Sequence, residues 1–469
     1  MPDRLHRHFQ CMGVAVYLAA LLIVSTCFHQ HALRPLWMAW GIGTVLCFFG
    51  LGYWFYQRWC HDTTKAFTRK LFWWALGIRM AYVGVIIFYY YFQTGVSFEY
   101  GATDSWNYHR CAGYLADLLR AGQFGEMVNV LSTNRLGFSD QGYLLYLTGL
   151  YTCFGKNILG PRLLKALMSA WMCVAIYRLA SRNLGEKTAR IAAVMALLLP
   201  QFIHYNGTYQ KETELLFLAV MALERFDYLI HSKRYTFWNI LVPVLFTVLT
   251  FGFRTIVGMT LIASFVVDVL CCEKPLLSRR ARVVVAASIV LLAGLLALTP
   301  VGKEMLMMAR INFGTGNATA EKYEAMELGY AQYASGKYTA PGFLTLPLTN
   351  LVEEANPNQK MMNGNYFIKN YLAFFALLSL VVAFRERRWR SLSLVGSFTL
   401  VYAVAIACSF AFNSERYHLP VMPGLLIMAA FAMVHFRRKD FKWYYAYCAV
   451  LLVAIVVWNY LKLAARGLV

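Results

Sequence analysis

A short polar stretch in an otherwise apolar chain carries side chains that can do chemistry. Residues 101–110 include a carboxylate, an imidazole, a guanidinium and two aromatic rings, namely Asp104, Trp106, Tyr108, His109 and Arg110. A carboxylate can take the proton of a hydroxyl group as that group attacks a substrate, which is general base catalysis. We therefore predict that Asp104 is a catalytic base. The structural alternative is a helix cap, because Asp is a preferred capping residue and Asp104 opens a predicted helix over residues 104–119.

Cationic side chains elsewhere in the chain lie at the ends of apolar segments. They are Lys211, Arg254 and Arg416, and Glu212 and His418 lie close to two of them. Ammonium and guanidinium groups bind phosphate oxygens, arginine often with two parallel hydrogen bonds. A fold that gathers these residues would form an anion site. Each also has an ordinary interpretation, the cations as interfacial residues whose charged ends reach water, and Glu212 as an acid that complements a helix N-terminus.

The composition indicates a membrane protein. Of 469 residues, 59% are hydrophobic and 14% charged, and the mean hydropathy is +0.49, which is more apolar than a soluble domain requires. The net charge of +21 is concentrated in short runs between apolar segments, such as Arg437, Arg438 and Lys439. Such runs are typical of cytoplasmic loops beside anionic lipids, so a nucleic-acid partner is not expected. The cysteines form no CxxC pair and no cluster with histidine, so no metal site is predicted.

Charge asymmetry orients the predicted membrane spans. The first three are residues 11–28, 36–55 and 71–92, and basic residues precede the first and the third. Because positively charged loops stay in the cytoplasm, we predict the N-terminus inside and the segment after residue 92 outside. The predicted helix over residues 104–119 has an apolar side and suits a position in the plane of the membrane surface. Asp104 is therefore predicted on the outer face.

Whether the apolar run 142–154 crosses the membrane decides the orientation of all later spans in the membrane. As a helix it is roughly 20 Å long, against about 30 Å of hydrocarbon, so we interpret it as a juxtamembrane or re-entrant helix. This interpretation returns Lys211 and Glu212 to the outer face. The later spans are predicted at residues 163–180, 191–203, 215–230, 238–251, 256–272, 283–298, 367–384, 392–412, 419–435 and 443–461. We thus predict an all-α bundle of about thirteen transmembrane helices with the C-terminus outside.

The topology divides the chain into four parts. Residues 1–70 hold two N-terminal spans and a cytoplasmic loop, and residues 71–299 form a catalytic membrane module with an outer loop over residues 93–162. Residues 300–366 form a long periplasmic loop, and residues 367–469 hold four C-terminal spans. A loop as long as 300–366 is typical of a functional segment.

Several short motifs, taken in order, resemble a known enzyme family. They are Asp104-x-x-x-Tyr108-x-x-x-Ala112, Gly122-Gln-Phe124, Phe154-Gly155, Arg162-Leu-Leu164, Ile176-Tyr-Arg-Leu-Ala180, Leu184-Gly185, Leu199-Pro200 before Lys211-Glu212, and Arg416-Tyr-His-Leu-Pro420 with Pro423. An arginine, Arg79, is embedded in the helix before them. Between residues 71 and 423 the chain resembles the GT-C glycosyltransferases of the protein O-mannosyltransferase and lipid A aminoarabinose transferase type.

The resemblance implies a GT-C-type fold and an inverting transferase that uses a polyprenyl-phosphate sugar. In the family the loop aspartate deprotonates the acceptor hydroxyl, and Asp104 matches it. Lys211 and Glu212 match a basic residue and an acid that help to form the site, although the family often has Asp in place of the Glu. The paired acids of metal-dependent members are absent around Asp104, so no metal is inferred and a divalent ion is left open. The spans before residue 71 are extra to the simplest family plan.

These considerations give each candidate residue an expected role. Catalysis is assigned to Asp104 and Glu212, donor-phosphate binding to Lys211, Arg254 and Arg416, and substrate binding to Tyr108, His109, Arg110, Arg135 and His418. The expected partners are a polyprenyl-phosphate sugar, an acceptor lipid, glycan or protein, and membrane lipids. The expected location is the bacterial inner membrane, with the site on its periplasmic face.

Two other classes of protein remain as alternatives. An O-antigen ligase or polymerase also has many spans and a large outer loop, but such enzymes use Arg and His there, and residues 300–366 contain no histidine. A lipid-linked glycan transporter or flippase would use a helix broken at Pro200 and a cationic pocket. The sequence has no inverted internal repeat, which counts against a transporter.

Overall fold

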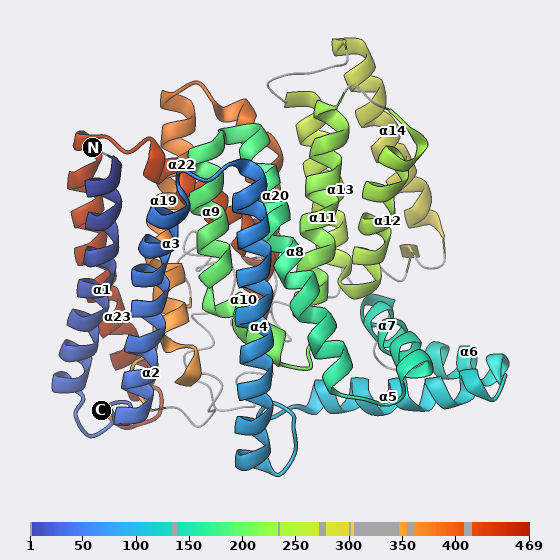
Figure 1. The fold of residues 1–469 in the computed structure, drawn as a ribbon, viewed down its shortest axis with the longest axis horizontal. Helices are drawn as coiled ribbons and strands as arrows, with labels where there is room; N and C mark the ends of the chain where they lie inside the picture. Colours follow the sequence, from blue (N-terminus) through green and yellow to red (C-terminus); the bar gives the residue numbers. More distant parts are fainter. Residues whose placement is uncertain are drawn as a thin grey trace. The chain divides into compact units, whose positions relative to one another are not determined.

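Helices make up the regular structure of this protein. The computed structural model describes residues 2–133, 138–232, 235–271, 278–299, 302–303, 347–353, 360–407 and 415–469. Within these ranges every regular element is a helix, and the strand-like pairing is confined to an isolated bridge between Ala32 and Val352. The prediction of an all-α protein is confirmed for these residues (Figure 1).

The described residues contain eight helical segments that are long and apolar enough to cross a membrane, or up to nine if a bent pair counts as one span. The eight are Arg7–Cys27, Pro35–Trp59, Thr64–Thr94, Leu159–Leu184, Asn363–Arg385, Trp389–Ile406, Glu415–Val434 and Arg438–Ala464. The bent pair is α9 (Glu186–Leu198) with α10 (Pro200–Gly207), at 40° to each other. The chain is therefore a multi-pass helical membrane protein.

The remaining predicted spans are also helical. They correspond to α11 (Glu212–His231), α12 (Phe237–Phe253), α13 (Thr255–Cys271) and α14 (Arg279–Leu298). Of these, α12 and α13 are shorter apolar helices. The count of about thirteen crossings stays a prediction. Most of the predicted outer loop 300–366 lies outside the described residues.

The chain forms two compact units, each made of segments that are distant in sequence. Unit 1 comprises Met1–Thr68, Ile176–Gln201 and Ile311–Val469, and unit 2 comprises Arg69–Ala175 and Phe202–Arg310. The sequence-based division into consecutive blocks differs from these units, because α9 belongs with the two chain ends rather than with residues 71–299. Helix α4 (Thr64–Thr94) and helix α8 (Leu159–Leu184) run from one unit into the other.

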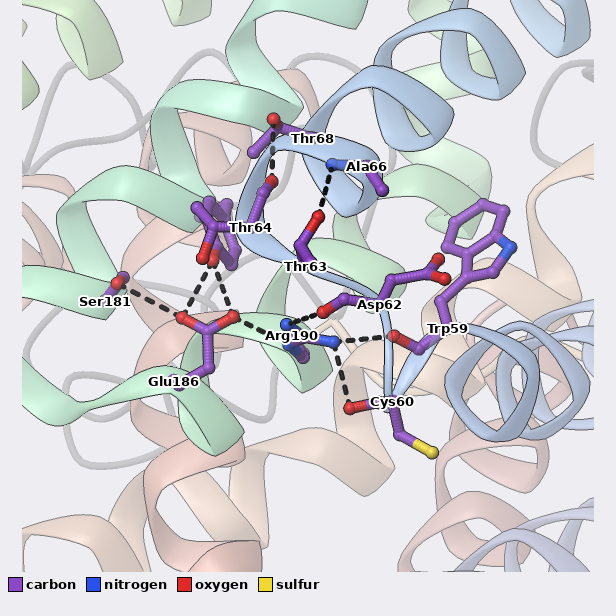
Figure 2. Close-up of polar contacts among 11 residues, drawn as sticks. Trp59, Cys60, Asp62, Thr63, Thr64, Ala66, Thr68, Ser181, Glu186 and Arg190 are labelled. Carbon is purple, nitrogen blue, oxygen red and sulfur yellow. Dashed lines mark hydrogen bonds and ion pairs between the residues drawn. The ribbon is translucent and has the colours of Figure 1, made fainter.

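In unit 1, Arg190 on α9 ties together two chain reversals (Figure 2). Its guanidinium donates to the carbonyl oxygens of Trp59 at 2.6 Å, Cys60 at 2.9 Å and Asp62 at 2.6 Å, all at or just after the end of α3 (Gly52–Trp59). The last carbonyls of a helix have no partners within it, so the cation satisfies them. Glu186 holds the guanidinium from the other side, at 2.7 Å from Nε.

This contact indicates whether the number of membrane crossings between the two reversals is even or odd. The α3–α4 loop and the α8–α9 loop both lie at Arg190, so they are on the same side of the membrane and an even number of crossings separates them. Helices α4 and α8 are the candidate spans between the loops, and α7 (Phe138–Phe154) is not a candidate span. That residues 142–154 do not cross stays a prediction.

Unit 2 carries the helices of the first polar stretch. Helix α5 (Thr103–Arg120) agrees with the predicted helix over residues 104–119, and α6 (Phe124–Thr133) follows it. Figure 1 shows α5 running crosswise to α4 within this unit, as expected for a helix lying in the membrane surface. Helix α7 packs on α5 and on α12, and α12 packs on α11.

A glycine pair lets α7 approach α12 closely. A Cβ atom added to Gly142 would lie 2.7 Å from the carbonyl carbon and oxygen of Gly252, so only glycine fits there. The approach brings the first turn of α7, which contains Asp140, to the end of α12. The sequence therefore places a carboxylate next to the α12–α13 junction.

Candidate functional site

Asp104 lies on the first turn of α5, and its side chain is exposed. The N-cap position of α5 is occupied by Ala102, without a side-chain capping bond. The capping alternative for Asp104 therefore has no support in the geometry. An exposed carboxylate is accessible to solvent and can take the proton of a hydroxyl group.

The neighbour of Asp104 connects α5 to a distant turn. Ser105 is buried and its hydroxyl donates to Oε1 of Glu99, while Oε2 of Glu99 accepts a hydrogen bond from the backbone N–H of Tyr209 at 3.1 Å. Tyr209 belongs to the turn between α10 and α11, two residues before Lys211. Ser105, next to Asp104, and the turn before Lys211 are thus held by the same carboxylate.

Lys211 and Arg254, two of the three cations predicted to bind phosphate, form two interlocked ion pairs in unit 2. Lys211 pairs with Asp140 and also donates to the carbonyl oxygen of Phe253 at 2.7 Å. The next residue in each segment makes the second pair, with Arg254 Nη2 at 3.2 Å from Oε1 of Glu212. The structure therefore brings Lys211, Glu212 and Arg254 together with Asp140.

Each cation in this cluster already faces a carboxylate. The side chains of Lys211, Arg254 and Glu212 are buried, while Asp140 is 27% exposed. A carboxylate and a phosphate ester are both anions whose oxygens accept hydrogen bonds from lysine and arginine. The oxygens of a phosphate ester can therefore take the positions of the carboxylate oxygens here. An anion bound to Lys211 would have to replace Asp140.

One buried acceptor in the cluster has no partner among the described residues. Oε2 of Glu212 receives no hydrogen bond there, although Oε1 faces Arg254. A buried carboxylate oxygen without a donor is costly. A ligand hydroxyl group at this position would satisfy it.

His109 lies one turn after Ser105 on α5 and is half-buried. Its Nδ1 is 2.6 Å from the hydroxyl oxygen of Tyr151, and this hydroxyl also hydrogen bonds with that of Tyr209. Burial, and then the positive charges of Lys156 and Arg162, lower the pKa of His109 below its ordinary value of 6.5. His109 is therefore neutral at physiological pH.

The other candidates on the first outer segment have different environments. Tyr108 is buried, with its ring edge-on to Tyr143 at a centroid distance of 4.9 Å. Arg110 is exposed on α5. Arg135 lies outside the described residues. Of the aromatic rings in residues 101–110, Trp106 is the exposed one, at 38%.

Arg416 and His418 belong to unit 1, in the short helix α21 (Glu415–His418). His418 is buried, with Nδ1 at 2.8 Å from Nζ of Lys369 on α19 (Asn363–Arg385). Glu415 is buried too and accepts hydrogen bonds from the side chains of Gln201, at 2.7 Å, and Asn365. Arg416 is half-buried, with its guanidinium over the ring of Tyr417. The motif therefore lies in a buried polar cluster of its own unit.

Three residues of the site were not predicted from the sequence. They are Asp140, Glu99 and Lys165, of which Lys165 lies within the predicted apolar span 163–180. A lysine within a predicted span is a usable signal, because a charged side chain there is generally functional or paired. The pairing of Asp140 with Lys211 depends on the glycine contact between α7 and α12, which no local pattern reveals.

No group of three or more histidine, cysteine, aspartate or glutamate side chains that could hold a metal ion occurs among the residues the structure describes. In the cluster around Lys211, Asp140 pairs with Lys211 and Glu212 pairs with Arg254.

Comparisons with known proteins add one relative. No family model matches the sequence. An uncharacterized protein from Aquifex aeolicus (strain VF5) is 28% identical to the chain over 178 residues, which are 36% of this chain and 33% of the relative. The chain thus matches about a third of that protein's length.

Proposed function

We propose that the protein is a membrane glycosyltransferase that moves a sugar from a polyprenyl-phosphate donor to an acceptor at the periplasmic face of the bacterial inner membrane. The observation that carries this proposal is the interlocked cluster of Lys211, Glu212, Phe253 and Arg254. Its two cations lie close together where α11 and α12 meet, and in our proposal the donor phosphate replaces Asp140 there. The proposed fold is the GT-C type with about thirteen crossings, in which α11 to α14 also cross.

The reaction follows from the charges available. The acceptor hydroxyl attacks C1 of the donor sugar while Asp104 takes its proton, so the new glycosidic bond forms on the face opposite the phosphate. The bond between C1 and the phosphate oxygen breaks, and its electron pair leaves with the polyprenyl phosphate. Lys211 and Arg254 stabilise the charge that grows on the phosphate. Configuration at C1 is inverted.

Glu212 has two roles in this scheme. Its Oε1 holds Arg254 in place at 3.2 Å, and its Oε2, which has no partner among the described residues, accepts a hydroxyl group of the donor sugar. Neutral His109 and exposed Trp106 line the approach of the acceptor on α5. The substrate roles of Arg416 and His418, which belong to unit 1, stay predictions from the sequence.

The test is transfer by the purified full-length protein in detergent or nanodiscs. Asp104→Asn keeps the shape of the side chain but removes the base, so we expect transfer to fall by about 10²–10⁴-fold with an unchanged unfolding midpoint. Asp117→Asn is the matched control, because Asp117 is an exposed acid on the same helix that pairs with Lys156. Full transfer by folded Asp104→Asn protein would refute the assignment of the base.

The 40° bend between α9 and α10 supports a transporter as the second candidate, because broken helices serve many transporters. A transporter moves a lipid-linked glycan across the bilayer without consuming it. Release of free polyprenyl phosphate by the purified protein distinguishes the two functions, since only the transferase produces it.

A further inference from the structure

The turn that leads into Lys211 is held by side chains from three other segments of unit 2. This 208–211 turn, Thr208–Lys211, links α10 to α11 and is not helical. The backbone N–H of Tyr209 donates to Glu99 at 3.1 Å, and its carbonyl oxygen accepts from the Tyr143 hydroxyl at 3.0 Å. The backbone N–H and carbonyl groups of Tyr209 are thus both bonded to buried side chains.

Lys165 holds the turn on the residues before and after Tyr209. Its Nζ atom donates to the carbonyl oxygen of Thr208 at 3.1 Å and to that of Gln210. The Lys165 side chain is fully buried, and its charge is balanced by Glu214, with Nζ at 3.5 Å from Oε2. One cation therefore joins two consecutive parts of the turn and the first turn of α11.

Burying the charge of Lys165 costs free energy that an apolar side chain at the same position would not cost. Lys165 lies in a segment that is apolar enough to span a membrane, where a buried charge is expensive and an apolar residue would pack well. Non-helical backbone at membrane depth persists only where its polar groups are satisfied. Glu99, Tyr143 and Lys165, which we name the frame, satisfy those of Thr208, Tyr209 and Gln210.

We infer that the frame residues are positioning residues for the donor-phosphate site. They hold the 208–211 turn in the conformation that presents Lys211 and Glu212 to the phosphate before the donor arrives. None of them touches the donor, so their effect runs through the turn and lowers the cost of ordering the site upon binding. This inference rests on the proposed function. It also gives Glu99 a second task, because Glu99 ties the same turn to Ser105, beside Asp104.

The first test compares two tyrosine variants of the full-length protein. Tyr143→Phe removes the hydroxyl that holds the carbonyl of Tyr209. Tyr146→Phe is the matched control, because Tyr146 lies on the same helix, stacks on Tyr143 at 6.1 Å and has a buried hydroxyl without a hydrogen-bond partner among the described residues. We expect Tyr143→Phe to raise the donor KM about fivefold, with the acceptor KM and the unfolding midpoint unchanged.

The second test separates positioning from charge balance. Lys165→Met alone leaves Glu214 as a buried unpaired charge and is expected to destabilise the protein. The double variant Lys165→Met/Glu214→Gln removes both charges but also both hydrogen bonds to the turn. We expect the double variant to recover the unfolding midpoint and to keep a donor KM raised by about tenfold or more. A purely structural lysine predicts recovery of both quantities.

Hydrogen exchange and direct binding complete the test. Amides of residues 208–211 are expected to exchange faster in Tyr143→Phe than in Tyr146→Phe, and undecaprenyl phosphate is expected to bind the Tyr143 and double variants more weakly than wild type. Equal donor KM values and equal binding in Tyr143→Phe, Tyr146→Phe and wild type would overturn the frame and leave the proposed function standing. Failure of the wild type to bind undecaprenyl phosphate would overturn the proposed function, and the positioning role with it.

Discussion

Asp140 pairs with Lys211, a cation that we assign to the donor phosphate. We therefore predict that a substitution at Asp140 strengthens donor binding. Replacing Asp140 by Asn removes a negative charge that pairs with Lys211 and would repel a phosphate. If Asp140 is exchanged for the phosphate, the variant should bind the donor more tightly than wild type. Most substitutions at a binding site weaken binding, so the sign is diagnostic.

The size of the effect follows from the exposure of the pair. The side chain of Asp140 is 27% exposed and that of Lys211 7%, so the pair is neither fully solvated nor fully buried. Exposed pairs contribute up to about 1 kcal/mol, and we take about 1 kcal/mol as the free energy that the donor has to offset. Because 1.4 kcal/mol corresponds to a factor of ten, the dissociation constant should fall about fivefold.

The assay is equilibrium binding of undecaprenyl phosphate to the purified protein, by calorimetry or by the shift of the unfolding midpoint. Asp117→Asn serves as the control, since it removes an acid that pairs with exposed Lys156. The control should leave the dissociation constant within twofold of wild type. Weaker binding by Asp140→Asn would mean that Asp140 orients Lys211 rather than competing with the ligand, and the exchange reasoning would be wrong.

Two further predictions concern stability. Arg190→Met removes three hydrogen bonds to backbone carbonyls, so it should destabilise the protein by about 3–5 kcal/mol, measured as a lower unfolding midpoint; exposed Arg280→Met should leave the midpoint unchanged. The lowered pKa of His109 means that the unfolded chain takes up this proton at a higher pH than the folded protein. Wild type should therefore lose stability relative to His109→Gln as the pH falls from 7 through about 6.5 to the lower folded-state value, and equal unfolding midpoints of the two proteins across that range would contradict the burial argument.

Local pattern was sufficient to predict that the regular structure of the described residues is helical. Apolar runs of the right length became helices, and the amphipathic stretch over residues 104–119 became α5. The embedded Arg79 is fully buried and donates to Ser169 at 2.6 Å and to Cys173 at 3.3 Å, as expected for a charge within a bundle. These features depend on periodicity and on the cost of burying charge, which are readable from sequence.

The pairing of side chains could not be predicted in the same way. Lys211 pairs with Asp140 and Lys165 with Glu214 because helices from different parts of the chain pack together. The sequence alone does not distinguish these partners from other acidic residues. The aromatic ring of Tyr108 is of the kind that binds sugars, yet the fold buries it against Tyr143. Lys211 and Arg254 were both located at the ends of predicted spans, but their ion-pair partners Asp140 and Glu212 could be identified only from the structure.

The contact of Arg190 with the end of α3 has a consequence for biosynthesis. Arg190 and Trp59 are 131 residues apart in sequence, so the N-terminal spans leave the ribosome long before the residue that fixes them is made. Until then the α3–α4 reversal lacks its cationic partner, and its helix-end carbonyls rely on water or lipid headgroups. Nascent chains arrested before Glu186 should therefore remain susceptible to proteases at residues 60–63, and chains extended beyond Arg190 should become resistant.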